Sequence, residues 1–217
     1  AFYIDLALID QLFEGQRLLV DMLMRFAEVF CEIEVFCVAG NHGRPGSKGQ
    51  HHQRTNLDTV LYRQVQQIIE RSGVERIKMY VSQSSAMLVQ HGRKLFHLSH
   101  GDDIRSWLGF PYYGADRKAH KLSRLYRLVP DYILYGHHHT PTQLDHWQIA
   151  NGSFVGASPY SVQRMHMASV PCQVMFYFHP RWGVNRVTTI LLDDIEGLER
   201  TKERVLTPIY AGGEKSA

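Results

Sequence analysis

The stretch IEVFCVAGNHG at positions 33–43 joins an apolar run to a Gly-Asn-His-Gly turn, and the prediction of the fold starts from it. Two later stretches repeat this arrangement. The mainly apolar residues 95–99 lead into His100-Gly101-Asp102-Asp103, and residues 132–135 lead into Gly136-His137-His138-His139-Thr140. Each apolar run is typical of a buried strand, and open α/β sheets build their active sites where strands end. Three strand ends that carry His or Asn predict one shared metal centre.

Outward from these stretches, apolar residues recur at helical spacing over residues 6–30, 57–71 and 117–129. Strands are predicted over residues 33–39, 77–81, 87–90, 94–99, 132–135, 147–150, 174–179 and 186–192. Helices that alternate with strands early in the chain, and strands joined by turns later, favour an α/β fold with a mixed sheet. Residues 1–194 are predicted to form one domain, followed by a surface helix and tail at residues 195–217.

The composition fits one globular domain. The chain has 217 residues, of which 44% are hydrophobic, and this is enough for one good core. The formal net charge of +3 is too small to indicate nucleic-acid binding by itself. No segment is predicted to span a membrane. Three cysteines with no CxxC pair are typical of reduced thiols in a cytoplasmic protein.

The histidines of the third stretch are candidate metal ligands. In an extended segment, residues two apart point to the same side, so His137 and His139 are predicted to face one cavity while His138 points away. Two imidazoles suit a divalent ion of the Zn, Mn, Fe or Ni group. Asn41 adds an amide oxygen and His100 adds a third imidazole. Because the set contains no thiolate, it favours a hydrolytic site over a structural zinc site.

His42 is assigned a different role. Neighbouring residues on a strand diverge, so His42 does not easily share an ion with Asn41. We expect it to meet the substrate as a proton donor or as an electrostatic partner for phosphate. The alternative for every one of these histidines is an ordinary surface or core position.

At this point the motifs resemble those of the calcineurin-like metallophosphoesterase family. Gly40-Asn41-His42 is similar to the family's Gly-Asn-His motif, His100-Gly101 to its single metal-binding His, and Gly136 to His139 to its Gly-His-x-His motif. The resemblance covers roughly residues 33–155. It implies a sandwich of two mixed β-sheets flanked by helices. It also implies two divalent ions, with Asn41, His100 and His137 on one, His139 on the other, and His42 as the catalytic histidine.

The chain departs from the family pattern before residue 40. The family's Asp-x-His and Gly-Asp motifs, which would complete the two-metal site, do not occur there. We expect that the chain is a fragment lacking its first strand-helix-strand segment; the alternative is a protein that has lost one metal site. Gly43-Arg44, together with the residues after His100, is similar to a phage and bacterial branch of phosphoesterases and DNA-repair exonuclease-like proteins.

Basic and aromatic residues suggest a phosphate-rich substrate. Arg44, Lys48 and Arg54 follow the first cluster, and a predicted helix carries Arg117, Lys118, Lys121, Arg124 and Arg127. Aromatic residues that could stack on bases lie at Trp107, Phe110, Tyr112 and Tyr113. Asp102 is predicted to orient His100 or to cap a turn. The alternatives are a solvated helix face and an aromatic loop packed over the core.

The sequence therefore predicts a two-metal phosphoesterase that cleaves phosphodiesters, with nucleic acid as the favoured substrate. Mn²⁺ is the favoured metal, with Zn²⁺, Fe and Ni²⁺ as alternatives. A phosphomonoesterase or nucleotide phosphatase, and a non-catalytic module that binds nucleic acid or protein, remain the competing hypotheses. The expected location is the cytoplasm, that of the host if the protein is phage-encoded. Oligomeric state is not predicted.

Overall fold

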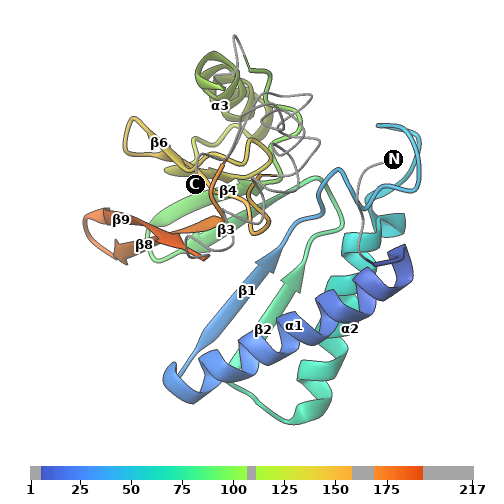
Figure 1. Cartoon of the computed structure of the whole chain (residues 1–217). Coiled ribbons are helices and arrows are strands. Elements are labelled where there is room, and N and C mark those ends of the chain that lie inside the picture. The colour runs from blue at the N-terminus through green and yellow to red at the C-terminus, as the bar shows by residue number, and fades with distance from the viewer. Residues whose placement is uncertain (1–5, 107–110, 158–168, 193–217) are drawn as a thin grey trace, which may run out of the picture. The chain divides into compact units, whose positions relative to one another are not determined.

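Helices and strands alternate along the first half of the chain, and strands dominate the second half (Figure 1). The computed structural model describes residues 6–106, 111–157 and 169–192. These residues divide into two compact units. The first unit holds residues 6–89 and 97–103, and the second unit holds the other described residues. No helix in the described ranges has the length and apolar character that crossing a membrane requires.

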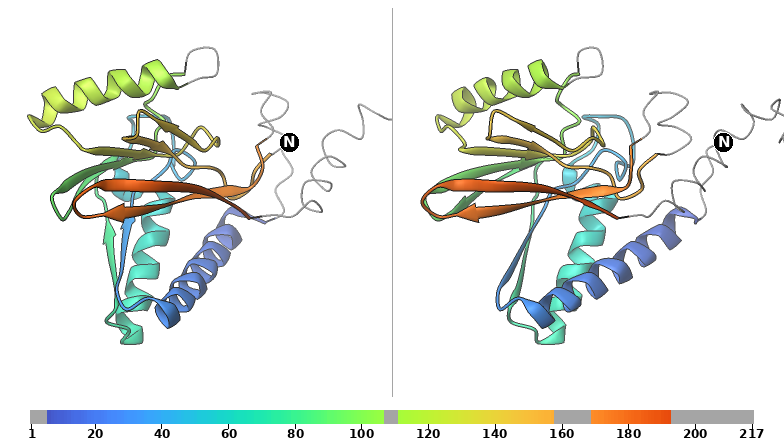
Figure 2. Two further views of the ribbon diagram at one scale, coloured as in Figure 1. Left: turned by 90° about the vertical axis from the view of Figure 1, so that its left-hand side faces the viewer. Right: turned by 60° about the vertical axis from the view of Figure 1, so that its left-hand side comes forward.

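The first unit contains a parallel strand pair with helices on one side. Helix α1 spans Leu8–Val29, strand β1 Ile33–Cys37, the short 3-10 helix η1 Gln53–Thr55, helix α2 Leu57–Ser72 and strand β2 Ile77–Val81. β1 and β2 pair in parallel from Ile33 opposite Ile77 to Cys37 opposite Val81. Parallel strands need a crossover connection, and α2 lies in it. Figures 1 and 2 show both helices on the same side of the two strands.

Apolar contacts hold these helices on the strands. Val65 and Ile69 of α2 are 0% and 2% exposed, and they pack with Leu23, Ala27 and Ile77. Full burial of one such aliphatic side chain contributes about 1.5–3 kcal/mol. α2 begins at an Asn56 cap and ends at Gly73, whose φ of 73° is the left-handed conformation that glycine adopts readily. The predicted helix at 57–71 and its glycine stop are therefore confirmed.

A mixed sheet of five strands runs in the order β3-β4-β5-β7-β6. Its strands are β3 Ala86–His91, β4 Lys94–Ser99, β5 Tyr132–Tyr135, β6 Thr142–Leu144 and β7 Gln148–Ala150. β7 pairs in parallel with β5 and antiparallel with β6, so the sheet is mixed. The predicted α/β fold with a mixed sheet is confirmed. β6 was not predicted, because three residues between turns are too short to show a period.

Helix α3, Tyr112–Tyr126, corrects the predicted helix at 117–129. Its buried face consists of Ala115, Lys118, Ala119 and Leu122, which follow helical spacing from an earlier start. The predicted apolar face through Leu125 and Val129 is wrong, because these two side chains are 72% and 75% exposed. Of the four aromatic residues predicted to stack on bases or to form a loop over the core, Tyr112 and Tyr113 open the helix instead of lying in a loop. Residues 107–110 lie outside the described ranges.

Two long antiparallel strands, β8 Cys172–His179 and β9 Gly183–Leu191, end the described part of the second unit. Tyr132 of β5 packs against their turn. Its ring stacks on Phe96 at 5.0 Å between centroids, and its hydroxyl oxygen accepts a hydrogen bond of 2.9 Å from the Val184 N–H. Both strands were predicted, each with a later start. The predicted helix and tail at 195–217 lie outside the described residues.

One ion pair within the second unit gives a pH-dependent prediction. Asp131 accepts hydrogen bonds from Lys94 Nζ at 2.7 Å and from the Leu95 N–H at 2.9 Å. Burial raises the pKa of the Asp131 carboxyl, but the bond and charge of Lys94 and the bond from Leu95 outweigh it, so the pKa lies below its ordinary value. A lowered pKa stabilises the fold above the unfolded value, about 4, and this stabilisation is lost as the pH falls through the folded value.

Asp131→Asn is therefore expected to reduce the free energy of unfolding at pH 7. The loss should be only about 1 kcal/mol, because the ion pair with Lys94 is partly exposed to water. The difference from wild type should shrink as the pH falls below about 4. Urea unfolding at pH 7, 5 and 3 measures it. The exposed Glu75, changed to Gln, is the matched control. A difference that does not depend on pH would contradict the prediction.

Candidate metal and substrate site

The Gly40-Asn41-His42-Gly43 loop follows β1 and is held by the first turn of α2. The Gly40 N–H donates to Asp58 Oδ2 at 2.7 Å, and Asn56 Nδ2 donates to the Gly40 carbonyl at 2.8 Å. The Leu57 N–H donates to the Gly43 carbonyl at 2.7 Å. Asn56 also caps α2, since its Oδ1 accepts from the Asp58 N–H at 2.9 Å. Both backbone polar groups of Gly40 are thus bonded to side chains of the helix start.

Asn41 and His100 are brought together across 59 residues of sequence. Asn41 Oδ1 lies 2.7 Å from His100 Nε2. This is a hydrogen-bond distance, and the bond joins two motif residues from distant parts of the sequence. An amide oxygen and an imidazole are also suitable ligand types for a divalent ion.

Both glycines of this loop are closely packed, Gly43 more tightly than Gly40. A Cβ built on Gly40 would lie 3.1 Å from His100 Cε1 and 3.2 Å from Asp58 Oδ2. A Cβ on Gly43 would lie only 2.2 Å from Asn56 Oδ1 and 2.6 Å from Asp58 Oδ1. The loop therefore packs tightly against the side chains of Asn56 and Asp58, which would have to move to admit a side chain at Gly43.

Gly43→Ala is expected to reduce the free energy of unfolding by about 1–3 kcal/mol, because the added methyl group overpacks the start of α2. Gly15→Ala in α1 is the control. Its Cβ would meet Leu61 at an ordinary 3.5 Å, and alanine favours the helix by up to about 1 kcal/mol. Urea unfolding of both variants measures the contrast, and a Gly43→Ala protein as stable as Gly15→Ala would contradict it.

His42 is exposed, as its predicted role in meeting substrate requires. Arg44 is partly buried, and its Nε donates to the Asn41 carbonyl at 3.1 Å. Arg44 therefore contacts the loop backbone as well as facing the carboxylate of Asp102. Both candidates, His42 for catalysis and Arg44 for substrate, stay predictions.

Asp102 pairs with two cations of the loop segment. Its Oδ2 lies 3.4 Å from Arg44 and 2.9 Å from Lys48, and Lys48 also donates to the Asp102 carbonyl at 3.0 Å. Burial raises the pKa of the Asp102 carboxyl, but the bond and charge of Lys48, with the charge of Arg44, lower it below its ordinary value. Asp102 thus fastens the segment after His42 to the turn that carries His100.

The third histidine stretch, in the second unit, corrects one premise of the sequence prediction. The segment is not extended, because His137 and His139 have φ values of 70° and 59°. The His138 N–H donates to the Gly136 carbonyl at 2.8 Å, which closes a γ-turn centred on His137. Left-handed conformations cost non-glycine residues of order 1–3 kcal/mol and are concentrated at functional sites. The roles of His137 and His139 as metal ligands stay predictions.

His138 lies inside this turn. Its ring contacts Tyr135 edge to face at 6.1 Å between centroids and His137 at 5.3 Å. Burial, followed by the charges of His137 and His139, lowers the pKa of His138 to about 4. His138 is therefore neutral at physiological pH, and its ring packs on the strand that precedes it.

The described residues contain no metal-binding group made only of Asp, Glu, Cys and His side chains. In residues 6–106, 111–157 and 169–192, no group of three such side chains could hold an ion. The Asn41–His100 pair contributes only one side chain of these types. The sequence prediction missed Asn56 and Asp58. An Asn-x-Asp pattern at a helix start signals a cap, but nothing in it signals bonds to residue 40.

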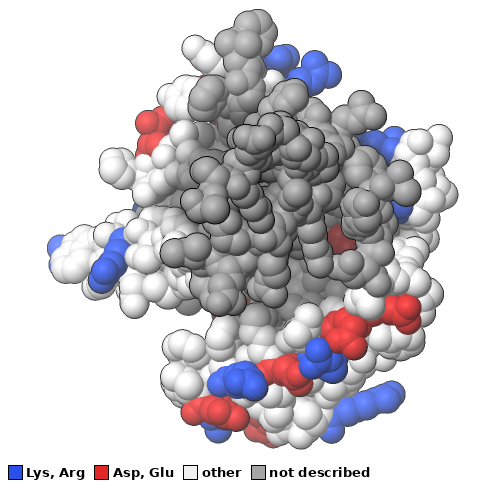
Figure 3. Space-filling view, in the orientation of Figure 1, with Lys and Arg blue, Asp and Glu red and all other residues white. Residues whose placement is uncertain are grey.

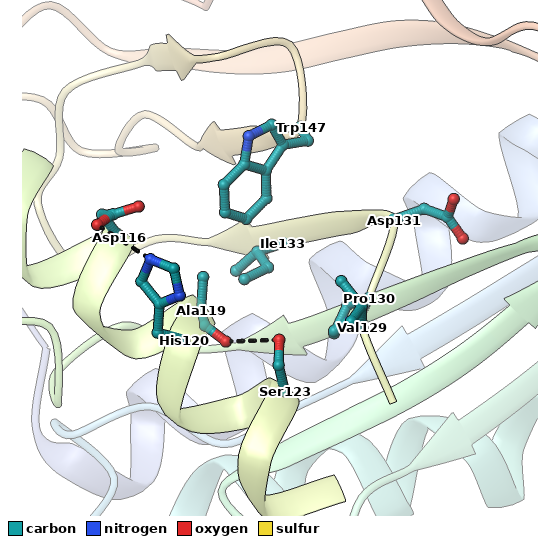
Figure 4. A pocket seen from close by; sticks show the side chains of 9 residues that line it. All are labelled: Asp116, Ala119, His120, Ser123, Val129, Pro130, Asp131, Ile133 and Trp147. Carbon is teal, nitrogen blue, oxygen red and sulfur yellow. Dashed lines mark hydrogen bonds and ion pairs between the residues drawn. The ribbon is translucent and has the colours of Figure 1, made fainter. Parts of the chain in front are cut away.

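One face of the molecule and one cavity bear on the predicted substrate path. On the face in Figure 3, acidic and basic side chains alternate along α1, including the Glu14–Arg17 and Arg17–Asp21 ion pairs. A mixed surface of this kind gives no polyanion track. A cavity of about 340 Å³ with mainly apolar walls lies between α3, Pro130 and Trp147. Figure 4 shows the side chains that line it. None of the predicted site residues lines it.

Comparison with known proteins finds similarity only among solved structures, since the sequence matches no protein-family model and no curated protein. The chain is similar to a single-residue variant of Vps29 from Entamoeba histolytica, with a TM-score of 0.42 and 13% identity, over 82% of this chain and 89% of that one. It is similar to an archaeal phosphodiesterase, with a TM-score of 0.38 and 11% identity, over 79% and 76%. It is also similar to wild-type Vps29 from Entamoeba histolytica in complex with zinc, with a TM-score of 0.35 and 14% identity, over 74% and 97%. Similarity at this level does not assign the chain to a family.

Proposed function

We propose that this protein is a metal-dependent phosphoesterase of the calcineurin-like type that hydrolyses phosphodiesters, with nucleic acid as the substrate. The observation that carries the proposal is the 2.7 Å contact between Asn41 and His100, two motif residues that the fold brings together from distant positions. The motifs of the sequence supply the rest of the proposed ligand set, His137 and His139. We place the protein in the cytoplasm, that of the host if it is phage-encoded.

Each residue has a proposed task. Asn41, His100 and His137 would hold one divalent ion and His139 a second, and Mn²⁺ is the favoured metal. Bound divalent ions polarise a phosphoryl group and lower the pKa of bound water. His42, which is exposed, would donate a proton to the leaving oxygen or stabilise charge on phosphate. Arg44 would contact an anionic part of the substrate.

The test is hydrolysis with Mn²⁺ of bis-p-nitrophenyl phosphate, single-stranded DNA, double-stranded DNA and a mononucleotide. We expect turnover of the diesters that EDTA abolishes and that Asn41→Ala or His137→Ala reduces. Faster turnover of the mononucleotide than of every diester would favour a phosphomonoesterase instead. DNA binding that EDTA leaves unchanged, with no turnover of any substrate, would overturn the proposal and favour a non-catalytic binding module.

A further inference from the structure

We propose that Asn56 and Asp58 are positioning residues for the Asn41–His100 pair, an inference that rests on the proposed function. Neither residue is part of a motif in the sequence. Both lie at the start of α2, and their side chains bond to Gly40, the residue directly before Asn41. Together they fix the loop backbone directly before Asn41.

The bonds to Gly40 go beyond what capping a helix requires. Capping is accomplished by Asn56 Oδ1, which accepts from the Asp58 N–H at 2.9 Å. Asn56 uses its other polar atom, Nδ2, to donate to the Gly40 carbonyl at 2.8 Å. Asp58 uses its carboxylate to accept from the Gly40 N–H at 2.7 Å, a charge-assisted bond of the stronger kind. A helix start without these two bonds would still be capped.

Burial of Asn56 makes its contact with Gly40 costly to lose. Asn56 is 1% exposed, so loss of its Gly40 partner would leave a buried donor without its bond, at a cost of about 1–3 kcal/mol. Gly40 also faces His100, because a Cβ at this position would lie 3.1 Å from the imidazole. A shift of Gly40 therefore displaces Asn41 and alters the packing of His100 at the same time. Both partners of the 2.7 Å contact depend on it.

Two substitutions separate positioning from capping. Asn56→Asp keeps an oxygen that can cap α2 but removes the donor to the Gly40 carbonyl. Asp58→Ala removes the acceptor for the Gly40 N–H, and Asp58→Asn restores an oxygen there. Thr59→Val is the matched control. It removes the bond from Thr59 Oγ1 to the Gln53 carbonyl in the same helix turn, and Thr59 is 5% exposed, but it leaves Gly40 untouched.

The first measurement is ¹⁵N NMR of the His100 imidazole in metal-free protein. We expect the His100 resonances to shift in Asn56→Asp and Asp58→Ala, and to stay at the wild-type positions in Thr59→Val. The second is titration with Mn²⁺ by calorimetry. We expect the dissociation constant to rise about 10–100-fold in Asn56→Asp and Asp58→Ala, with most of the affinity restored in Asp58→Asn.

The outcomes distinguish this inference from the proposed function. Unchanged His100 resonances in Asn56→Asp and Asp58→Ala would overturn the inference, whether or not the protein binds metal. An equal shift and an equal loss of affinity in Thr59→Val would overturn it too, since the effect would then be general destabilisation. If wild type binds Mn²⁺ but hydrolyses no phosphoester, the proposed function fails and the positioning role stands on the two measurements.

Discussion

His42→Ala is expected to lower kcat for Mn²⁺-dependent hydrolysis of bis-p-nitrophenyl phosphate by about 10²–10⁴-fold, the contribution typical of a positioned general acid or base. The side chain is exposed, so its removal should change the free energy of unfolding by no more than about 0.5 kcal/mol. Because we assign His42 to the substrate rather than to an ion, the affinity for Mn²⁺ should stay close to that of wild type. Steady-state kinetics and calorimetric titration measure the two quantities.

His51→Ala is the matched control, since His51 is also exposed and lies on the same segment after β1. Its activity should equal that of wild type. If His42→Ala hydrolyses the diester as fast as His51→Ala, His42 has no part in the chemistry. If instead His42→Ala loses affinity for Mn²⁺ in proportion to its loss of activity, His42 is a metal ligand. The assignment of His42 to the substrate is then wrong.

Gly183→Ala is expected to reduce the free energy of unfolding by about 2–4 kcal/mol. Gly183 has a φ of 81°, which costs an alanine about 1 kcal/mol. Its added methyl group would also collide with the hydroxyl of Tyr132, at a built distance of 1.9 Å, and overpacking adds about 1–3 kcal/mol. Tyr132 cannot easily withdraw, since its ring stacks on Phe96 and its oxygen accepts from the Val184 N–H.

Gly92→Ala isolates the backbone part of this effect. Gly92 has a φ of 58° in the turn between β3 and β4, and a Cβ there would meet nothing within 4 Å. Its expected loss is about 1 kcal/mol. Urea unfolding of the two variants under the same conditions measures the difference. Equal losses would show that the contact with Tyr132 contributes nothing.

The sequence predicted best where a periodic pattern was long or bounded by strong turn residues. Helix 57–72 ends at Gly73 because glycine adopts the left-handed conformation readily, and the strands at 77–81 and 132–135 have the predicted bounds. Helix α3 shows the limit. In the sequence, Leu125 and Val129 continue the apolar period, but both side chains are exposed. The buried face consists instead of Ala115, Ala119 and Leu122 together with Lys118. The two alanines are small and contribute little to a periodic hydrophobic pattern.

At the candidate site, the residue types were predictable and the backbone was not. Asn41 and His100 were predicted to lie close together, and a hydrogen bond of 2.7 Å joins them, while their role as ligands stays a prediction. The left-handed residues His137 and His139 contradict the extended segment, because histidine rarely adopts this conformation and no local sequence signal announces it. Asn56 and Asp58 were missed since bonds to a residue 16 or 18 positions away leave no pattern.

The contact between Asn41 and His100 has a consequence for binding affinity. Closing a flexible loop of about 59 residues costs about 4 kcal/mol of chain entropy, whereas one hydrogen bond contributes only about 1 kcal/mol. The contact cannot close that loop by its own strength, so strand pairing and the capped helix must close it. Any ligand that binds both side chains therefore meets a preorganised pair, and little of its binding free energy is spent on ordering them.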